Sequence, residues 1–336
     1  MRIVVFGGAG FIGSAVCRMM VAERGATILN IDKLTATSSL ASLKPIAQSP
    51  RYSFRKADIC DRERIAALLH AFAPDAIVHA AAERQSAARI GGAACAIETN
   101  VLGTWRVLEA AREYWETLRP SVQQKFRLLS VSASDSHASP AAASKAGADE
   151  LVTTWHKSYG LPTIVSKAAP TFGPYQFPSE LVARATIAAI DRDESTAATG
   201  EAHDWLYVED HVRALALMLD KGAPGATYHV AGRGSISSVE LAERAALLVE
   251  RHGANSGTKA GNTPRSDNLK CKSDVLPAAT AASSALLEQD TGWRPEETID
   301  TALSKTVRWY LSNEAWWRPL SAAEAAGHDF GVLRIA

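Results

Sequence analysis

Cysteine is scarce in this sequence: only four occur in 336 residues, and no two form a Cys-x-x-Cys pair. Their scattered positions (Cys17, Cys60, Cys95 and Cys271) predict free thiols in a reducing cytoplasm rather than a disulfide framework. The nine histidines lack the spacing of metal ligands, so no metal site is expected. His79, at the end of an apolar segment, is interpreted as a packed core residue.

An excess of charge of either sign is also missing, because 36 basic and 36 acidic residues cancel. This balance leaves no basic footprint for nucleic acid or for an anionic membrane surface. No apolar run reaches the ~18 residues that span a bilayer. The chain opens directly on a strand-like pattern at residues 2–6 instead of the longer apolar stretch of a cleavable signal. We therefore expect a cytoplasmic protein without nucleic-acid or membrane partners.

Strand and helix patterns alternate through the first half of the chain. Hydrophobic periodicity predicts strands at Ile3–Phe6, Thr27–Ile31, Tyr52–Lys56, Ala76–His79, Phe126–Ser132 and Thr163–Ser166. It predicts helices at Ile12–Ala22, Arg62–Phe72, Ala94–Tyr114 and Pro140–Tyr159. This alternation is typical of βαβ units with helices on both sheet faces. The predicted fold class is α/β, a Rossmann-type doubly wound parallel sheet.

The alternation stops after Ala168, where Pro, Gly and short helical stretches mix. Later segments predict strands at Trp205–Val208 and Ala226–Ala231, and helices at Val212–Leu219, Val239–Arg251, Ser283–Thr291 and Ile299–Asn313. We predict a nucleotide-binding domain over residues 1–168, with its sheet completed by parts of 204–231. Residues 169–320 form a smaller, interleaved substrate lobe, and 321–336 a weakly ordered tail.

A glycine-rich turn joins the first predicted strand to the first predicted helix. Gly7, Gly10 and Gly13 fit the spacing of a dinucleotide site and have the strand-to-helix context that this motif requires. Glycines permit the tight turn and the close approach of a pyrophosphate. The N–H groups at the helix start, near Phe11 and Ile12, then face the negative charge. The turn therefore predicts a dinucleotide cofactor.

An acidic residue, Asp32, ends the second predicted strand about 20 residues after the glycines. A carboxylate there accepts hydrogen bonds from ribose hydroxyls and repels a 2′-phosphate, which favours NAD over NADP. The neighbouring Lys33 weakens that preference. Asp58 and Ile59 follow the third strand, where they could contact an adenine edge. Asp58 has an alternative interpretation as a cap of the helix that begins at Arg62.

Longer stretches of the chain carry a family resemblance, from residue 1 to about 320. They are residues 7–13, 32–35, 80–83, 98–104, 144–146, 173–178, 204–211, 292–295 and 305–311. Together they resemble the extended short-chain dehydrogenase/reductase family and, more narrowly, its dTDP-glucose 4,6-dehydratases. The resemblance implies NAD held also by Ala80, Ala81, Ala82, Asn100 and Lys145.

The resemblance also implies a reaction and an assembly. Such an enzyme oxidises a dTDP-glucose-like nucleotide sugar at C4, eliminates water across C5–C6 and returns the hydride to C6. It uses a tyrosine base with a lysine four residues later, and a threonine with an acid–base pair after the fifth strand. Its long helices, here Ala94–Tyr114 and Pro140–Tyr159, pack into a homodimer interface.

The catalytic positions of that family are altered in this chain. The lysine is present as Lys145, but Ala141 stands at the tyrosine position, and a methyl group cannot take a proton from a hydroxyl. The threonine and the acid are replaced by Ala133 and Ser134, and the following loop is short. Positions that would line the sugar-nucleotide cleft also differ, within residues 84–89, 167–173, 203 and 262–268.

Three residues remain as candidates for catalysis: Lys145, Asp135 and Ser132. The altered motifs predict an NAD-binding relative of the dehydratases that is catalytically impaired. An active nucleotide-sugar dehydratase or epimerase that uses other groups, such as Asp135 or His137, stays open as an alternative. A purely structural Rossmann module ranks last, because Asp32 and the glycines would then have no role.

Overall fold

The computed structural model describes residues 1–83, 92–133, 139–193, 202–254 and 283–325. Seven strands form one parallel sheet in the order β10-β6-β5-β4-β1-β2-β3. Their bounds are β1 Arg2–Phe6, β2 Thr27–Asp32, β3 Tyr52–Lys56, β4 Ala76–His79, β5 Arg127–Ala133, β6 Thr163–Ala168 and β10 Thr227–Val230. The strand order reverses between β1 and β4, as in a doubly wound sheet. The predicted fold class is confirmed.

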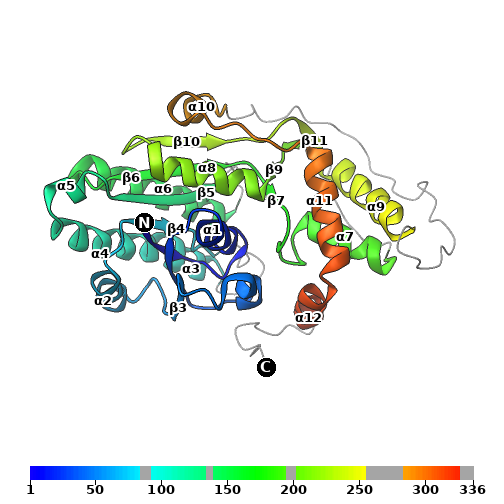
Figure 1. Ribbon diagram of the computed structural model, residues 1–336, viewed down its shortest axis with the longest axis horizontal. Helices are drawn as coiled ribbons and strands as arrows, with labels where there is room; N and C mark the ends of the chain where they lie inside the picture. Colours follow the sequence, from blue (N-terminus) through cyan, green and yellow to red (C-terminus); the bar gives the residue numbers. More distant parts are fainter. Residues whose placement is uncertain (84–91, 134–138, 194–201, 255–282, 326–336) are drawn as a thin grey trace.

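Helices cover both faces of this sheet (Figure 1). On one face α1 (Phe11–Ala22) and α8 (Val208–Lys221) pack on the buried side chains of Ile3 and Val5. On the other face α2 (Arg62–Phe72), α4 (Thr104–Glu116) and α6 (Pro140–Tyr159) pack on Val4 and Phe6. Both faces of the central strands are therefore buried, which explains their nearly continuous apolar sequences.

Helix α6 has clear start and stop signals. Pro140 occupies its first turn, and the Ser139 hydroxyl accepts a hydrogen bond from the Ala142 N–H at 3.1 Å. Its last turn ends at Gly160, whose φ of 73° is a left-handed conformation that glycine adopts readily. These local signals place the helix at the bounds predicted from the sequence.

The helix predicted over Ala94–Tyr114 is interrupted in the structure. It consists of α3 (Gly92–Ala96), a π-helical segment η3 (Ile97–Gly103) and α4. Within η3, the buried Asn100 side chain points inward and bonds to the backbone of Glu83. The wider π turn is of the kind found at functional sites.

Four helices of the C-terminal lobe gather beside the sheet (Figure 1): α7 Leu181–Asp191, α9 Ser238–Ala254, α11 Ile299–Ser312 and α12 Glu314–Ala325. The short strands pair as β7 (Thr171–Phe172) with β9 (Leu206–Tyr207) and as β8 (Ala202–Asp204) with β11 (Ser235–Ser237). The remaining short helices are η1 Leu40–Ile46, α5 Pro120–Gln123 and α10 Ala285–Thr291. The strand predicted at Trp205–Val208 is shorter than expected, since Val208 already begins α8.

One stack of side chains connects the C-terminal helices to helix α1 beside the sheet. The guanidinium of Arg18, on α1, lies 3.9 Å from the ring centre of Tyr175. Tyr175 in turn packs against two tryptophans. Its ring centre lies 4.4 Å from that of Trp309 and 5.5 Å from that of Trp316. The same guanidinium donates to the carbonyl oxygen of Ser42 at 2.8 Å. These contacts join α1 to α11 and α12.

The last described helix extends into the segment predicted as a tail. Helix α12 continues to Ala325, and Trp317 and Leu320 are buried in it. Residues 321–325 are therefore helical. Residues 326–336 lie outside the described part of the chain. The predicted domain boundaries at 168 and 320 stay predictions.

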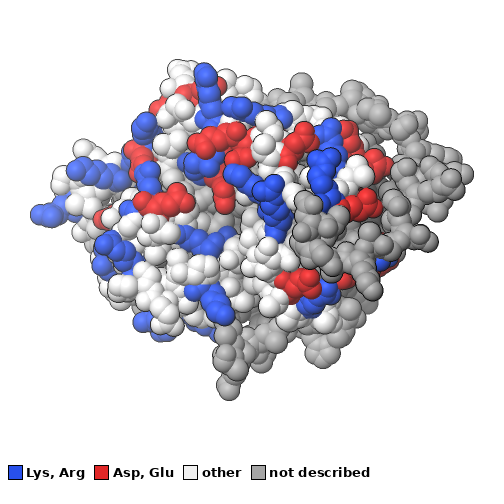
Figure 2. Space-filling view, turned by 45° about the vertical axis from the view of Figure 1, so that its right-hand side comes forward, with Lys and Arg blue, Asp and Glu red and all other residues white. Residues whose placement is uncertain are grey.

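Four further features of the described residues are their surface charge, the length of their helices, their thiols and their potential metal ligands. On the face in Figure 2, acidic and basic side chains are interspersed. None of the described helices is long and apolar enough to cross a membrane. Cys17, Cys60 and Cys95 are free thiols, and Cys271 lies outside the described residues. Within the described ranges, no cluster of histidine, cysteine and carboxylate side chains could hold a metal ion.

Candidate functional site

The turn between β1 and α1 leaves little room for side chains. A Cβ atom on Gly13 would lie 2.2 Å from the Gly7 carbonyl oxygen, and one on Gly7 would lie 2.6 Å from the Ala81 Cα. At Gly10 the nearest atom would be the Gly7 oxygen at 3.3 Å, so there the space opens into a pocket. Helix α1 begins without a side-chain cap. Its first N–H groups therefore remain available to an anionic ligand.

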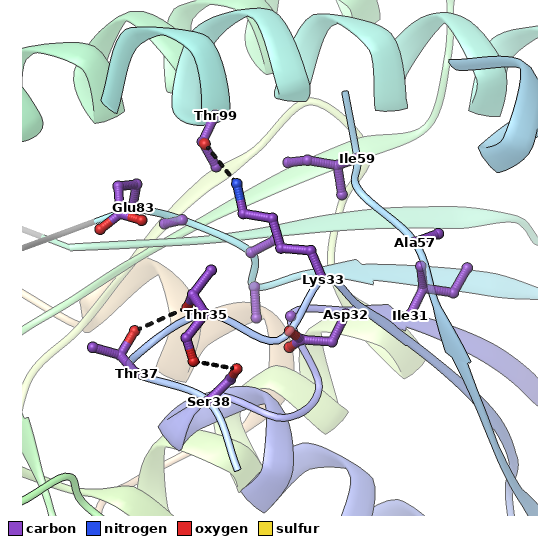
Figure 3. Close-up of a pocket in the computed structure, with 15 residues that line it drawn as sticks. Ile31, Asp32, Lys33, Thr35, Thr37, Ser38, Ala57, Ile59, Glu83 and Thr99 are labelled. Carbon is purple, nitrogen blue, oxygen red and sulfur yellow. Dashed lines mark hydrogen bonds between the residues drawn. The ribbon is translucent and has the colours of Figure 1, made fainter. Parts of the chain in front are cut away.

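The pocket lies beside this turn, at the carboxyl ends of the central strands (Figure 3). It is lined by Gly7, Gly10, Ile31, Asp32, Lys33, Thr35, Thr37, Ser38, Ala57, Ile59, Ala80, Ala81, Ala82, Glu83 and Thr99. This is the position at which open α/β sheets bind their ligands. Eight of the predicted cofactor residues are in this lining; Phe11, Ile12, Gly13, Asp58, Asn100 and Lys145 are not.

Asp32 is held in place by the backbone around the pocket. One carboxylate oxygen accepts a hydrogen bond from the Ala9 N–H at 3.0 Å, and the other accepts from Leu34 N–H at 2.7 Å. The side chain is buried, and this burial raises the pKa of the Asp32 carboxyl above its ordinary value. Each oxygen keeps capacity for a further donor. The pocket therefore presents a fixed hydrogen-bond acceptor.

Lys33 extends across the pocket from β2 (Figure 3). Its ammonium donates to the Thr99 hydroxyl at 3.2 Å and pairs with the Asp58 carboxylate at 3.5 Å. Asp58 also accepts from the Cys60 N–H, whereas the cap of α2 is Asp61. The alternative interpretation of Asp58 as the helix cap is therefore wrong.

Three hydroxyl residues in the lining, Thr35, Thr37 and Ser38, were not among the predicted site residues. They reach the pocket because Leu34 adopts a left-handed conformation with φ of 62°, which redirects the chain after β2. The Ser39 N–H then donates to the Ala9 carbonyl at 2.8 Å and fastens this segment to the glycine turn. The sequence gives no signal for the turn at Leu34, because a leucine adopts the left-handed conformation only rarely.

A second group of predicted residues lies at the ends of β4 and β5 and the start of α6. The Asn100 amide donates to the Glu83 carbonyl at 3.0 Å and to the Ser144 hydroxyl at 2.9 Å. Ser144 donates to the carbonyl of Ala141 at 2.8 Å. Asn100 therefore ties the chain after β4 to the first turn of α6, where Ala141 is located.

Ser132 and Lys145 are brought near each other through Asp149. The Ser132 hydroxyl donates to the Asp149 carboxylate at 2.7 Å, and Lys145 lies four residues before Asp149 on α6. Ala133 ends β5 and is exposed. Ser134, Asp135 and His137 lie outside the described residues.

His79 is a core residue, as predicted. It is fully buried, and its Nε2 atom is 2.9 Å from the Thr104 hydroxyl. Burial, with a smaller effect from the charge of Lys145, lowers the pKa of His79 to about 3. A neutral imidazole at this depth serves packing.

Comparison with known proteins places this geometry in context. Residues 4–306 match the family of GDP-mannose 4,6 dehydratase. The chain belongs to this family. It is 38% identical over 361 aligned residues to a probable dTDP-glucose 4,6-dehydratase of Sinorhizobium fredii, with full coverage of both chains. It is 36% identical to the dTDP-glucose 4,6-dehydratase of Neisseria meningitidis, with coverage of 94% of this chain and 95% of that protein.

Solved structures of the family share the fold. The dTDP-glucose 4,6-dehydratase of Bacillus anthracis, in complex with NAD, has a TM-score of 0.76 at 29% identity, covering 95% of this chain and 99% of that one. The enzyme of Streptomyces venezuelae, also with NAD bound, has a TM-score of 0.76 at 31% identity, with coverages of 95% and 100%. The resemblance predicted from the glycine turn and the stretch 204–211 is thus confirmed.

Proposed function

We propose that this member of the family binds NAD and is impaired in 4,6-dehydratase chemistry. One observation carries the proposal: a pocket is assembled around Gly10 and Asp32, while Ala141 occupies the turn of α6 before Lys145. The pocket around Gly10 and Asp32 has the open backbone and the hydrogen-bond acceptor that a dinucleotide requires. The second half of the site lacks the tyrosine base, the threonine and the acid at the three positions matched to the family, which are Ala141, Ala133 and Ser134 here.

NAD fits the residues of the pocket. Gly7, Gly10 and the start of α1 would hold the pyrophosphate, because a Cβ atom on Gly10 would occupy the space beside the turn. Asp32 would accept hydrogen bonds from the adenosine ribose, and Ile59 would lie against the adenine. Lys33 is paired with Asp58, whose negative charge partly offsets its attraction for a 2′-phosphate. When bound, NAD supplies an acceptor for the hydride of a sugar carbon.

The remaining predicted cofactor residues are assigned to this NAD site as well: Phe11, Ile12, Gly13, Ala80, Ala81, Ala82, Asn100 and Lys145. Lys145 would contact the nicotinamide ribose. The ligand beside NAD would be a nucleotide sugar of the dTDP-glucose kind, because the curated relatives are named for it. Ala141 carries a methyl group where that chemistry needs a tyrosine base, and Ala133 carries one where it needs a threonine; loss of an acid–base group costs ~10²–10⁴ in rate.

We further propose that the protein is a homodimer. Segment η3 and helix α4 pack against α6. Ile97, Leu102 and Trp105 on the first two are 49%, 43% and 39% exposed although they are large and apolar. A second copy of this chain would cover these three side chains. The interface would be formed by η3, α4 and α6, which lie in the two segments that the family resemblance predicts for it.

Titration of the apo-protein with NAD and with NADP tests the cofactor proposal. We expect NAD to bind more tightly, and Gly10→Val to weaken NAD binding at least about tenfold, because its side chain enters the pyrophosphate space. Gly147→Ala is the control, since its Cβ atom would meet only an ordinary contact at 3.9 Å. Equal affinities for NAD and NADP would contradict the role given to Asp32.

A turnover assay tests the proposed impairment. Protein supplied with dTDP-glucose and NAD should form 4-keto-6-deoxy product ~10²-fold or more slowly than an intact relative. Rapid product formation, followed by chromatography, would favour an active dehydratase or epimerase that uses Asp135 or His137. Asp135→Ala and His137→Ala would then identify the group.

A further inference from the structure

A buried carboxylate in the middle of α6 has no role in the site described so far. Asp149 is only 4% exposed. Its Oδ2 atom accepts from the Ser132 hydroxyl at 2.7 Å. Its Oδ1 atom is buried and, within the described part of the chain, has no hydrogen-bond partner. A charged oxygen left in this state is costly and calls for an explanation.

Positive charge surrounds this carboxylate from two elements. The ammonium of Lys167, on β6, lies 3.9 Å from Oδ2. Lys145 lies one helical turn earlier on α6. Burial is the largest influence and raises the pKa of Asp149, whereas Lys145, the hydroxyl of Ser132 and Lys167 act in the opposite direction, Lys145 most strongly. The carboxylate therefore lies among two lysines and a hydroxyl.

The topology explains how these groups meet. Ser132 on β5 and Lys167 on β6 are register partners, so their side chains leave the sheet on the same face, toward α6. On α6, Ala141, Lys145 and Asp149 follow at intervals of four residues and share one face of the helix. Asp149 therefore lies one helical turn after Lys145, whereas position 141 lies one turn before it.

We propose that Asp149 is a positioning residue that holds the Lys145 ammonium at the cofactor site. Ser132 and Lys167 hold the carboxylate in place, and its negative charge restricts the rotamers of the Lys145 side chain before NAD binds. Less rotamer entropy is then lost when Lys145 contacts NAD. This inference rests on the proposed function, in which Lys145 contacts NAD. It makes Lys167 and Ser132 supports of NAD binding without direct contact.

A double-mutant cycle measured on the full-length protein tests this inference. Calorimetric titration gives the NAD dissociation constants of the wild type, Asp149→Asn, Lys145→Met and the double variant. We expect Asp149→Asn to weaken binding about tenfold and Lys145→Met at least as much, with the double variant no weaker than Lys145→Met alone. Glu150→Gln, which removes a carboxylate from the exposed side of the same helix, should bind NAD like the wild type.

Additive losses in the double variant would overturn the inference, because a merely structural Asp149 would weaken binding regardless of Lys145. Unchanged affinity of folded Asp149→Asn would overturn it as well. If Asp149→Asn does not fold, Ser132→Ala replaces it in the cycle and should lower affinity only while Lys145 is present. Wild-type protein that binds no NAD would overturn the proposed function, and this inference with it; binding with additive losses overturns this inference alone.

Discussion

At the scale of single residues, two buried histidines make the stability of this protein sensitive to acid. Burial lowers the pKa of His79 to about 3 and that of His211 to about 4. In the unfolded chain both titrate near ~6.5. Between these values the unfolded state binds more protons than the folded state. Stability is therefore fully present above about pH 6.5 and is lost progressively as the pH falls toward 4.

The expected slope is as much as ~1.4 kcal/mol per pH unit for each histidine. Urea unfolding between pH 7.5 and pH 5 measures it. His79→Asn should reduce the slope, because one of the two fully buried histidines no longer titrates. The exposed His70 gives the control variant His70→Asn. Equal slopes for wild type and His79→Asn would contradict this account.

Residues were predictable where their signal is local. The place of Gly7, Gly10 and Asp32 in the pocket lining could be predicted, because the turn and the strand end define it within a few positions. Thr37 and Ser38 were not, because they reach the pocket only through the left-handed backbone at Leu34. A leucine carries no signal for that conformation.

At the scale of elements, α6 is the helix on which the proposed loss of the tyrosine base can be tested. Positions 141 and 145 are one turn apart on the same face. Ala141→Tyr should therefore place a phenol beside the Lys145 ammonium, whose charge would lower the pKa of the phenol from ~10. With dTDP-glucose and NAD, we expect this variant to accumulate NADH absorbance without releasing product, since Ala133 and Ser134 still lack the acid for elimination.

Ala143→Tyr is the matched control, because residue 143 is exposed on α6 and points elsewhere. Its NADH signal should equal that of the wild type. If Ala141→Tyr binds both ligands and gives no more signal than the control, position 141 is not the site of the base. A strong signal from the unmodified protein would instead support a working enzyme.

Elements whose ends carry local sequence signals could be predicted. Segment η3 could not, because its shape depends on contacts with residues that are distant in the sequence. Both α6 and β3 (Tyr52–Lys56) have the bounds predicted from the sequence. Segment η3 departs from the regular helical periodicity around Asn100, whose partners are the distant Glu83 and Ser144. Local propensity contains no information about such partners.

At the scale of the whole molecule, the prediction concerns assembly. A dimer through η3, α4 and α6 would bury Trp105, so Trp105→Glu should place a charge in the interface and yield a monomer of 35.8 kDa. Leu247→Glu is the control, because Leu247 is 64% exposed on α9 in the lobe. Light scattering after gel filtration gives both masses; a wild-type monomer, or a dimeric Trp105→Glu variant, would contradict this interface.

The glycine turn and the first turn of α6 differ in how much mutation they tolerate. At Gly13 even a methyl group would collide with the Gly7 oxygen at 2.2 Å, so changes there are selected against through folding itself. Ala141 is half-buried and caps nothing, and its side chain is not needed to begin the helix. A substitution at position 141 can therefore change proton transfer without disturbing the glycine turn. A lineage released from selection for turnover would still inherit a nucleotide-binding protein.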